Sequence, residues 1–380
     1  MCKANRNVMS YESFLVGVVN SAISTNLLQD DIRLLGHNGP YYDQQTRVRN
    51  ISHWSIILAG VHKITHDDKY CKMAVSLLEE LLSYSSDYTY THRQKMGKDM
   101  QNGVIGTAWN IEAFILGYQY SGDKRFFNEA IRLTKLFPFD HSKGLWRCCT
   151  PEGKIVGYDA TFNHQLWYAA SIAMVWTITK DNDLEEQLNR FFDKLPHIMN
   201  IYSSGLIHHP ISYGLLQERY RVVLRKCKYA FRKVLNGESF YYKELGYHCF
   251  VVYAFAIIKS AGYRHSFFDS VSFAKILDFT FSSKFLAEVK KENNKSDVTH
   301  LPLREIKVIG NRYGYAYNPV GFELQFINAI FGLNKEEVAF SEFQFEIEHF
   351  FDRKIFYAVN TEDNATLTAR VYELARVFLL

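Results

Sequence analysis

The stretch His53-Trp-Ser-Ile-Ile-Leu-Ala-Gly-Val-His-Lys-Ile-Thr-His-Asp-Asp-Lys-Tyr70 decides the fold. Its apolar residues recur at the spacing of an α-helix, and its polar end forms a turn into a second amphipathic helix, Tyr70–Leu82. The same layout recurs along the chain, so a helical hairpin is predicted as the repeating unit. The further copies are Ala108–Tyr120 with Phe126–Phe137, Leu166–Thr179 with Leu184–Phe192, Tyr247–Ala261 with a helix from Phe267, and Phe322–Phe331.

Hairpins of this kind cannot bury their apolar faces alone, and they are expected to stack sideways until the array closes. The sequence therefore predicts an all-α fold, an (α/α) toroid of five or six hairpins that forms a single domain over residues 1–380. The first helix of each hairpin is apolar on nearly all sides and is expected to line the inside of the ring. Shorter helices are expected within Ile211–Val234, and short β-hairpins on the rim within Val308–Tyr317 and Phe345–Ala358.

Composition excludes several classes of protein. Hydrophobic residues make up 47% of the 380 residues and aromatic residues 16%, which is typical of a globular protein. A net charge of +4 is too small to indicate nucleic-acid binding. The one basic run, Arg219–Lys233, is interpreted as the solvated face of an amphipathic helix in preference to a membrane or polyanion contact.

Cysteine usage and hydropathy indicate the compartment. The six cysteines lack the spacing of a zinc site, and we expect reduced thiols and no bound metal. The longest apolar run, Phe250–Ile258, is far too short to cross a bilayer, and the short apolar piece Phe14–Val19 is too brief for a signal peptide. The sequence thus predicts a cytoplasmic protein without a transmembrane segment.

The segment Tyr158–Trp167 carries the densest group of reactive side chains. Asp159 can serve as an acid or a base, Asn163 can hold an oxyanion or a carboxylate, and His164 can move protons near neutral pH. Two of the three have a structural alternative, Asn163 as a helix N-cap and His164 as a core histidine. The candidate catalytic residues are Asn163, His164, Tyr247, His248 and Asp159.

Polar residues also gather ahead of, or in the first turns of, the other inner helices. If those helices run parallel, their N-terminal ends open on one face of the ring, where partial positive charge favours an acidic or polyhydroxylated ligand. An acidic oligo- or polysaccharide is therefore the expected partner. The candidate substrate-binding residues are Arg47, Arg49, His53, Trp54, Asn102, Trp109, Glu112, Trp167, His208, Lys243, Glu244, Arg312, Tyr315, Tyr317 and Glu323.

The order Asn163-His164-x-x-Trp167, followed later by Tyr247-His248, resembles the toroidal polysaccharide lyases of the alginate lyase type. The layout of Asn50-x-x-His53-Trp54 also looks like the wider six-hairpin glycosidase group. The arginines of the lyase motif have no equivalent here, so Lys243 or Arg47 would take their place.

The resemblance implies β-elimination from a uronate residue with neither metal nor cofactor. Asn163, with Arg47 or Arg49, would neutralise the carboxylate, and His164 or Tyr247 would remove the C5 proton. Tyr247 or a neighbouring tyrosine would protonate the leaving oxygen. A base role for Tyr247 requires a cationic neighbour, either His248 or Lys243, because the pKa of a free tyrosine is about 10.

Three alternatives stay open on the sequence alone. A glycoside hydrolase would need two facing carboxyl groups, which Asp159 could form with Glu112, Glu244 or Glu323. A sugar epimerase could use paired histidines such as His164 and His248. A protein that binds or assembles glycans without catalysis would use the same aromatic and polar residues.

Overall fold

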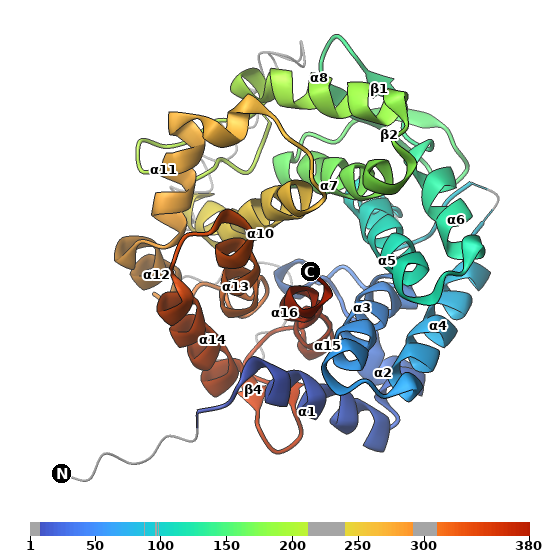
Figure 1. Cartoon of the computed structure of the whole chain (residues 1–380), viewed down its shortest axis with the longest axis vertical. Coiled ribbons are helices and arrows are strands. Elements are labelled where there is room, and N and C mark those ends of the chain that lie inside the picture. The colour runs from blue at the N-terminus through green and yellow to red at the C-terminus, as the bar shows by residue number, and fades with distance from the viewer. Residues whose placement is uncertain (1–7, 87, 96, 98, 212–239, 292–309) are drawn as a thin grey trace.

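Helical hairpins arranged in a ring form the whole architecture (Figure 1). The computed structural model describes residues 8–86, 88–95, 97, 99–211, 240–291 and 310–380. The hairpins are α3 (Arg47–Thr65) with α4 (Asp68–Ser83), α5 (Ile105–Ser121) with α6 (Lys124–Thr134), α7 (Phe162–Thr179) with α8 (Asn182–Ile198), α10 (Phe240–Ser260) with α11 (Val271–Thr280) and α12 (Ser283–Val289), and α13 (Val320–Phe331) with α14 (Glu336–Phe350).

Each of the first three hairpins turns by the same two-residue device. The inner helix ends at a residue with left-handed backbone, and the next residue is an aspartate whose carboxylate accepts a hydrogen bond from the first turn of the outer helix. This device explains the repeated polar turn in the sequence. The three pairs are His66 with Asp67, Gly122 with Asp123, and Lys180 with Asp181.

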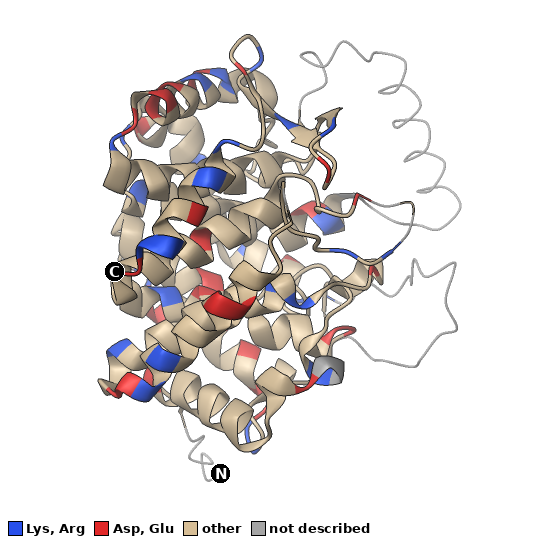
Figure 2. Cartoon of the chain, turned by 90° about the vertical axis from the view of Figure 1, so that its right-hand side faces the viewer, with Lys and Arg blue, Asp and Glu red and all other residues tan. Residues whose placement is uncertain are grey.

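Inner and outer helices differ in burial as their sequences predict. In α5 every residue from Ile105 to Gly117 is buried, because the helix packs on neighbours at both sides and on its own outer helix. The outer helix α8 buries one stripe, which includes Leu184, Leu188 and Phe191, and turns its charged residues outward. Figure 2 shows basic and acidic segments interspersed over the described outer helices, in keeping with the small net charge.

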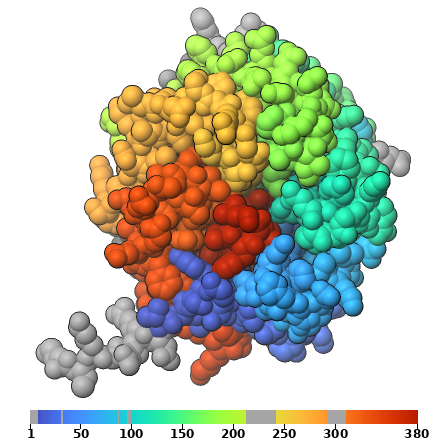
Figure 3. Space-filling model, viewed as in Figure 1, coloured from blue at the N-terminus to red at the C-terminus, as the bar shows by residue number. Residues whose placement is uncertain are grey.

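The ring closes through the C-terminal segment. Helices α3, α5, α7, α10 and α13 pack in that order, and α16 (Tyr372–Ala375) fills the remaining inner position between α13 and α3. Two short helices flank α16, α15 (Asn364–Ala369) before it and the 3-10 helix η5 (Arg376–Leu379) after it, while the N-terminal helix α1 (Tyr11–Ser24) packs on α3 from outside. Figure 3 shows this C-terminal segment, in dark red, in the middle of one face of the ring.

The predicted all-α toroid is confirmed, and the five predicted inner helices match observed ones within a few residues at most ends. The strand expectations were less accurate. Residues 312–317 form turns, and Phe345–Phe350 belongs to α14, so only the hairpin β4 (Phe351–Asp352) and β5 (Tyr357–Ala358) lies in the second predicted region. The basic run and most of the shorter helices predicted within Ile211–Val234 lie outside the described residues.

A three-stranded antiparallel sheet that the sequence analysis did not predict leads into α7. It consists of β1 (Phe139–Asp140), β2 (Leu145–Cys149) and β3 (Ile155–Tyr158), in that order. Its position matters because β3 ends at Tyr158, directly before Asp159. Among the described helices, none combines the length and the hydropathy needed to span a bilayer.

Candidate active site

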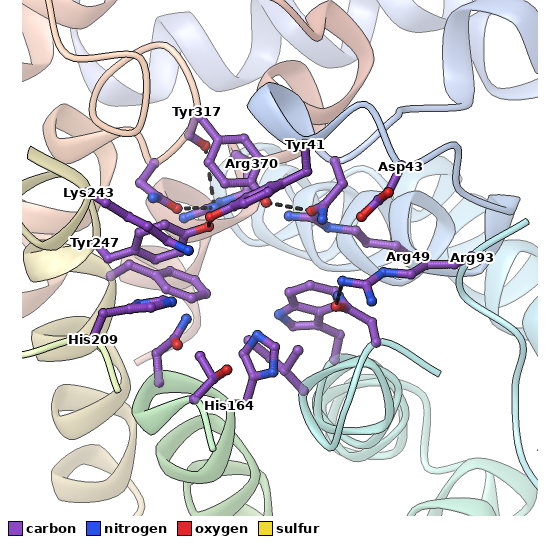
Figure 4. A pocket seen from close by; sticks show the side chains of 18 residues that line it. Tyr41, Asp43, Arg49, Arg93, His164, His209, Lys243, Tyr247, Tyr317 and Arg370 are labelled. Atoms are coloured by element: carbon purple, nitrogen blue, oxygen red, sulfur yellow. Dashed lines mark hydrogen bonds between the residues drawn. The ribbon is translucent and has the colours of Figure 1, made fainter. Parts of the chain in front are cut away.

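A cavity of about 230 Å³ opens where the inner helices begin. Its lining comes from the first turns of α3, α5, α7 and α10, from the loops that precede the inner helices, and from the C-terminal segment (Figure 4). The parallel inner helices therefore bring distant parts of the chain together. The lining residues are Asn38, Tyr41, Asp43, Arg49, Arg93, Asn102, Ile105, Trp109, Thr161, Asn163, His164, His209, Lys243, Tyr247, Phe250, Tyr317, Asn318 and Arg370.

His164 faces this cavity with a carboxylate directly behind it. Its Nδ1 lies 2.6 Å from Oδ2 of Asp159, whose Oδ1 accepts the backbone N–H of Thr161 at 3.0 Å. Burial tends to raise the pKa of Asp159, but the charge of His164 and these hydrogen bonds outweigh it and leave the pKa lowered. An ionised Asp159 holds the proton of the imidazole on Nδ1 and leaves Nε2 as the basic atom. Gly103 packs so closely that an added Cβ would lie 1.8 Å from Asp159 Oδ2.

A pair of tyrosines lines another part of the wall. The hydroxyl oxygens of Tyr41 and Tyr247 are 2.8 Å apart, and Lys243 Nζ lies 5.1 Å from the ring centroid of Tyr41 and 5.8 Å from that of Tyr247. Burial and the neighbouring tyrosine Tyr317 hold the pKa of Tyr247 well above its usual range. Tyr247 therefore keeps its proton at neutral pH, and the proton is available for donation to a strongly basic oxygen.

His209 adds a second imidazole to the wall and is fixed by its backbone. Its N–H donates to Oε1 of the buried Glu244 at 3.1 Å, and its carbonyl accepts the N–H of Phe162 at 2.9 Å. The ring lies 4.7 Å from that of Tyr247. Burial, Lys243 and His164 lower its pKa well below the usual range, so this imidazole is neutral at physiological pH.

Two arginines give the cavity an excess of positive charge, because both bond to neutral oxygens. Arg49 donates to the side-chain oxygens of Asn38 at 3.1 Å and of Gln45 at 3.3 Å, and Arg93 donates to Asn102 and to the carbonyl of Asp99. Buried polar atoms in the same wall have no partner among the described residues, a pattern that suits a polar ligand. These atoms are Arg49 Nε, Arg93 Nε, Trp109 Nε1 and Asn163 Oδ1.

The C-terminal segment supplies a further lining residue, Arg370. Its guanidinium stacks 4.6 Å from the ring centroid of Phe250 and bonds to Asn318 Oδ1 at 2.8 Å, Glu323 Oε1 at 2.9 Å and Glu373 Oε1 at 2.5 Å. Burial raises the pKa of Glu373 to about 7 against the opposing effect of Arg370. These contacts hold Arg370 rigidly, and the carboxyl groups of Glu323 and Glu373 largely neutralise its charge.

The structure gathers eight of the sequence-predicted residues at the cavity and puts Asp159 immediately behind one of them. This convergence is the arrangement that the parallel inner helices lead us to expect. The eight are Asn163, His164, Tyr247, Arg49, Asn102, Trp109, Lys243 and Tyr317.

Four of the predicted polar residues do not reach the cavity, because partners elsewhere hold them. Arg47 points to the outside of the ring and pairs with Glu80 at 2.9 Å, and Arg312 pairs with Glu362 at 2.7 Å. His208 Nδ1 lies 3.0 Å from Glu244 Oε1, and His208 does not line the cavity, whereas its neighbour His209 does. His248 is buried, with Nε2 3.0 Å from the hydroxyl of Thr280. Helical geometry explains why His248 points away from the cavity, because the side chains of consecutive residues in an α-helix project about 100° apart. His248 therefore cannot be the cation beside Tyr247. Lys243 is the cationic residue that lies near Tyr247.

The three glutamates predicted as partners of Asp159 in a hydrolase do not face the cavity either. Glu112 pairs with Arg376, Glu244 accepts from Tyr202 and His208, and Glu323 pairs with Arg370. Among the described lining residues the only carboxylate is that of Asp43, whose Oδ1 lies 3.4 Å from Lys95 Nζ. The described part of the cavity thus lacks the facing pair of carboxyl groups that the hydrolase alternative requires.

The remaining predicted residues belong to the packed interior. Trp54 is core, and Trp167 stacks on Phe250 with ring centroids 4.7 Å apart. His53 stacks on Tyr372 at 4.0 Å, and Tyr315 donates its hydroxyl proton to Glu342. In the described part of the chain, no three His, Cys, Asp or Glu side chains are grouped so that they could hold a metal ion.

A sequence comparison identifies the family. Over 356 residues the chain is 30% identical to archaeal glycosylation protein Q of Haloferax volcanii, and the match covers 90% of this chain and 91% of the relative. The chain belongs to the family of archaeal glycosylation protein Q. No protein-family model matches it.

Solved structures similar to this member of the glycosylation protein Q family share its fold. A D-mannose isomerase superposes with a TM-score of 0.64 at 10% identity, covering 99% of each chain. The cellobiose 2-epimerase of Bacillus thermoamylovorans B4167 gives a TM-score of 0.61 at 11% identity over 97% of this chain and 100% of its own. A polysaccharide lyase gives 0.57 at 12% identity over 96% of both chains. These neighbours confirm the resemblance to the wider group of toroidal sugar enzymes at the level of the fold.

The candidate residues named from the sequence left out several residues that line the cavity. Asn38, Tyr41, Asp43, Arg93 and His209 all precede inner helices, so the rule that singled out Asn102 and Asn163 also applies to them. No such signal existed for Arg370. It belongs to a short segment without the periodicity of the hairpins, and only the closed ring reveals its place in this member of the family.

Proposed function

We propose that this protein is an enzyme that acts on an acidic glycan and cleaves it by β-elimination at a uronate residue. The observation that carries the proposal is the Asp159–His164 pair in a cavity that also holds a protonated tyrosine and two arginines whose hydrogen bonds among the described residues all go to neutral oxygens. The relative's name, glycosylation protein, and the sugar enzymes among the structural neighbours support glycan chemistry in general.

The proposed reaction begins with neutralisation of the substrate carboxylate. Arg49 and the amide of Asn163 would hold that carboxylate, which lowers the pKa of the C5 proton and stabilises the negative charge that develops on its removal. Asn163 would donate through its amide N–H groups, and Arg49 through the unpartnered Nε. Arg93 would add positive charge to the same wall.

Two protein groups would then move the proton. Nε2 of His164 would take the C5 proton, the electron pair of the broken C–H bond would form the C4–C5 double bond, and the C4–O4 bond would break. Tyr247 would give its proton to O4, which leaves as the anomeric oxygen of the departing sugar. The steps balance without water or an oxidant, and proton transfer from His164 to Tyr247 through solvent would restore the starting state.

A second reaction, epimerisation at C5, is favoured by one observation. His164 and the neutral His209 both line the cavity, and His164 contributes to the lowered pKa of His209 after burial and Lys243. If one imidazole removed the proton and the other returned one to the opposite face, the sugar would change configuration without bond cleavage.

Incubation with uronate-containing oligosaccharides in D₂O separates these reactions. Elimination gives the ultraviolet absorbance of the unsaturated uronate, and epimerisation gives deuterium at C5 without that absorbance. New reducing ends without absorbance would indicate hydrolysis and would overturn the proposal, as would glycan binding without any reaction.

Variants test the assigned residues. His164→Ala and Tyr247→Phe are expected to abolish turnover while the helical circular dichroism spectrum stays intact. The matched controls are His141→Ala, which removes an exposed imidazole 3.4 Å from Glu186, and Tyr84→Phe, which removes an exposed hydroxyl. Both controls are expected to keep wild-type activity.

A further inference from the structure

The cavity is walled by every inner position of the ring. Five of the positions contribute through residues within or just before their inner helices, and the sixth contributes Arg370 of the C-terminal segment. Figure 4 shows the labelled side chains arranged around the cavity on all sides of the view. Most lining side chains are deeply buried, as Arg49 at 1% exposure and Tyr247 at 7% illustrate.

The floor of the cavity is solid. Arg370 and Phe250 form part of it, and both pack on buried residues beneath. Farther down the ring axis every residue from Val371 to Arg376 is buried, and Arg376 pairs there with Glu112 of α5. The C-terminal segment that fills the middle of the opposite face therefore prevents a glycan from passing through the ring (Figure 3).

One side of the wall is a cluster of tyrosines. The loop Asn38–Asp43 lies against the segments ahead of α15 and α13, because the N–H of Gly39 donates to Asp363 Oδ2 at 2.8 Å and the hydroxyl of Tyr317 donates to Asn38 Oδ1 at 2.6 Å. Tyr41 in this loop contacts Tyr247 of the neighbouring α10, and their hydroxyl oxygens are 2.8 Å apart. This contact closes the wall between these positions.

We infer that the cavity accepts the terminal residue of an acidic glycan and excludes an internal one. An internal residue needs room for the chain on both its sides, whereas a cavity that the described residues close at the floor and around the wall leaves the chain the mouth as its exit. The volume of about 230 Å³ suits a single sugar residue and no long segment. This inference rests on the proposed function for the nature of the ligand.

The inference fixes which end of the glycan reacts in an elimination. Cleavage breaks the bond between C4 and O4, so the departing chain must be attached at O4 of the bound uronate. That chain leaves through the mouth, and the anomeric carbon faces the wall or the floor. The bound residue is then the reducing-end uronate, which is released as a 4,5-unsaturated monosaccharide, while the departing oxygen, now the anomeric oxygen of the leaving chain, receives the proton of Tyr247.

Four synthetic tetrasaccharides test the inference. Each contains three neutral hexoses and one uronate, and the uronate occupies a different one of the four positions in each compound. Affinity is measured by calorimetry with the inactive His164→Ala protein, and turnover by ultraviolet absorbance with the wild type. We expect at least about tenfold tighter binding of an end-uronate sugar than of both internal ones, with absorbance only from the reducing-end substrate. Comparable binding or turnover of an internal uronate would overturn the inference.

The two readouts separate the inference from the proposed function. Selective binding of an end uronate without absorbance from any substrate would support the terminal pocket and overturn elimination. Binding of none of the four would overturn the terminal pocket. The variant Tyr41→Ala, which opens the wall beside Tyr247, is expected to reduce the preference for an end uronate by at least about threefold, and an unchanged preference would contradict the role given to this part of the wall.

Discussion

Nδ1 of His164 lies 2.6 Å from Oδ2 of Asp159, and the other oxygen of the same carboxylate accepts the N–H of Thr161. This carboxylate both fixes the start of α7 and orients the imidazole. Asp159→Asn keeps the shape but removes the charge that holds the proton on Nδ1. We expect kcat to fall about 100-fold or more with a small change in KM. Steady-state kinetics on a uronate substrate measure this, and an unchanged kcat would exclude His164 as the base.

Tyr247 is assigned as the acid and Tyr41 as its neighbour. General acid catalysis contributes about 10²- to 10⁴-fold, so Tyr247→Phe should lower kcat by at least about 100-fold and Tyr41→Phe by less than about tenfold. A substrate whose leaving group is a nitrophenol needs no protonation, so it should restore most of the rate of Tyr247→Phe. Equal losses on both substrates would mean that Tyr247 does not act as the acid.

Glu244 is predicted to be a positioning residue for His209. Its buried carboxylate accepts the backbone N–H of His209 at 3.1 Å and the hydroxyl of Tyr202 at 2.7 Å. Glu244→Gln should lower kcat about tenfold with little loss of thermal stability, because the loop that holds His209 against the ring of Tyr247 shifts while the core stays packed. The control is His208→Gln, whose ring contacts the same carboxylate outside the cavity, and it should retain activity. If Glu244→Gln had the kinetics of the wild type, Glu244 would not be a positioning residue for His209.

The C-terminal segment should make a large contribution to stability through its buried charges. Burial lowers the pKa of Arg376 to about 9, and its guanidinium pairs with Glu112 inside the ring. Arg376→Met leaves a buried carboxylate without its partner and should cost about 3 to 5 kcal/mol. The double variant Glu112→Gln with Arg376→Met should recover a large part of that loss. Denaturant titrations measure both, and equal stabilities of the single variant and the wild type would contradict the pairing.

His248 should make the stability depend on pH. Burial lowers its pKa in the folded protein to about 3, whereas in the unfolded chain the pKa is about 6.5, so its contribution is complete above pH 6.5 and declines as the pH falls. Between pH 7.5 and pH 5 the wild type should lose about 2 kcal/mol through this residue. His248→Gln cannot lose it, so its stability relative to the wild type should improve by that amount at pH 5. A difference that does not change with pH would show that His248 is protonated in the folded protein.

Local sequence was sufficient for the hairpins. The apolar spacing of Leu166–Thr179 and the polar turn that follows it predict α7 and α8, because helix periodicity and the aspartate cap are short-range effects. The repeat also predicted that residues such as Asn102 and Asn163 converge, since equivalent helix ends in a closed ring meet on one face.

The sequence by itself determined the repeating unit, the ring and the face on which polar residues gather. Only the tertiary structure decided which of those residues share one cavity. His208 and His209 are adjacent, as are Tyr247 and His248, yet one of each pair lines the cavity and the other bonds elsewhere. The sequence likewise contained no signal that Arg370 lines the cavity. The helical periodicity depends on residues a few positions apart in the sequence. Side-chain direction and ring closure depend on contacts between residues far apart in the chain.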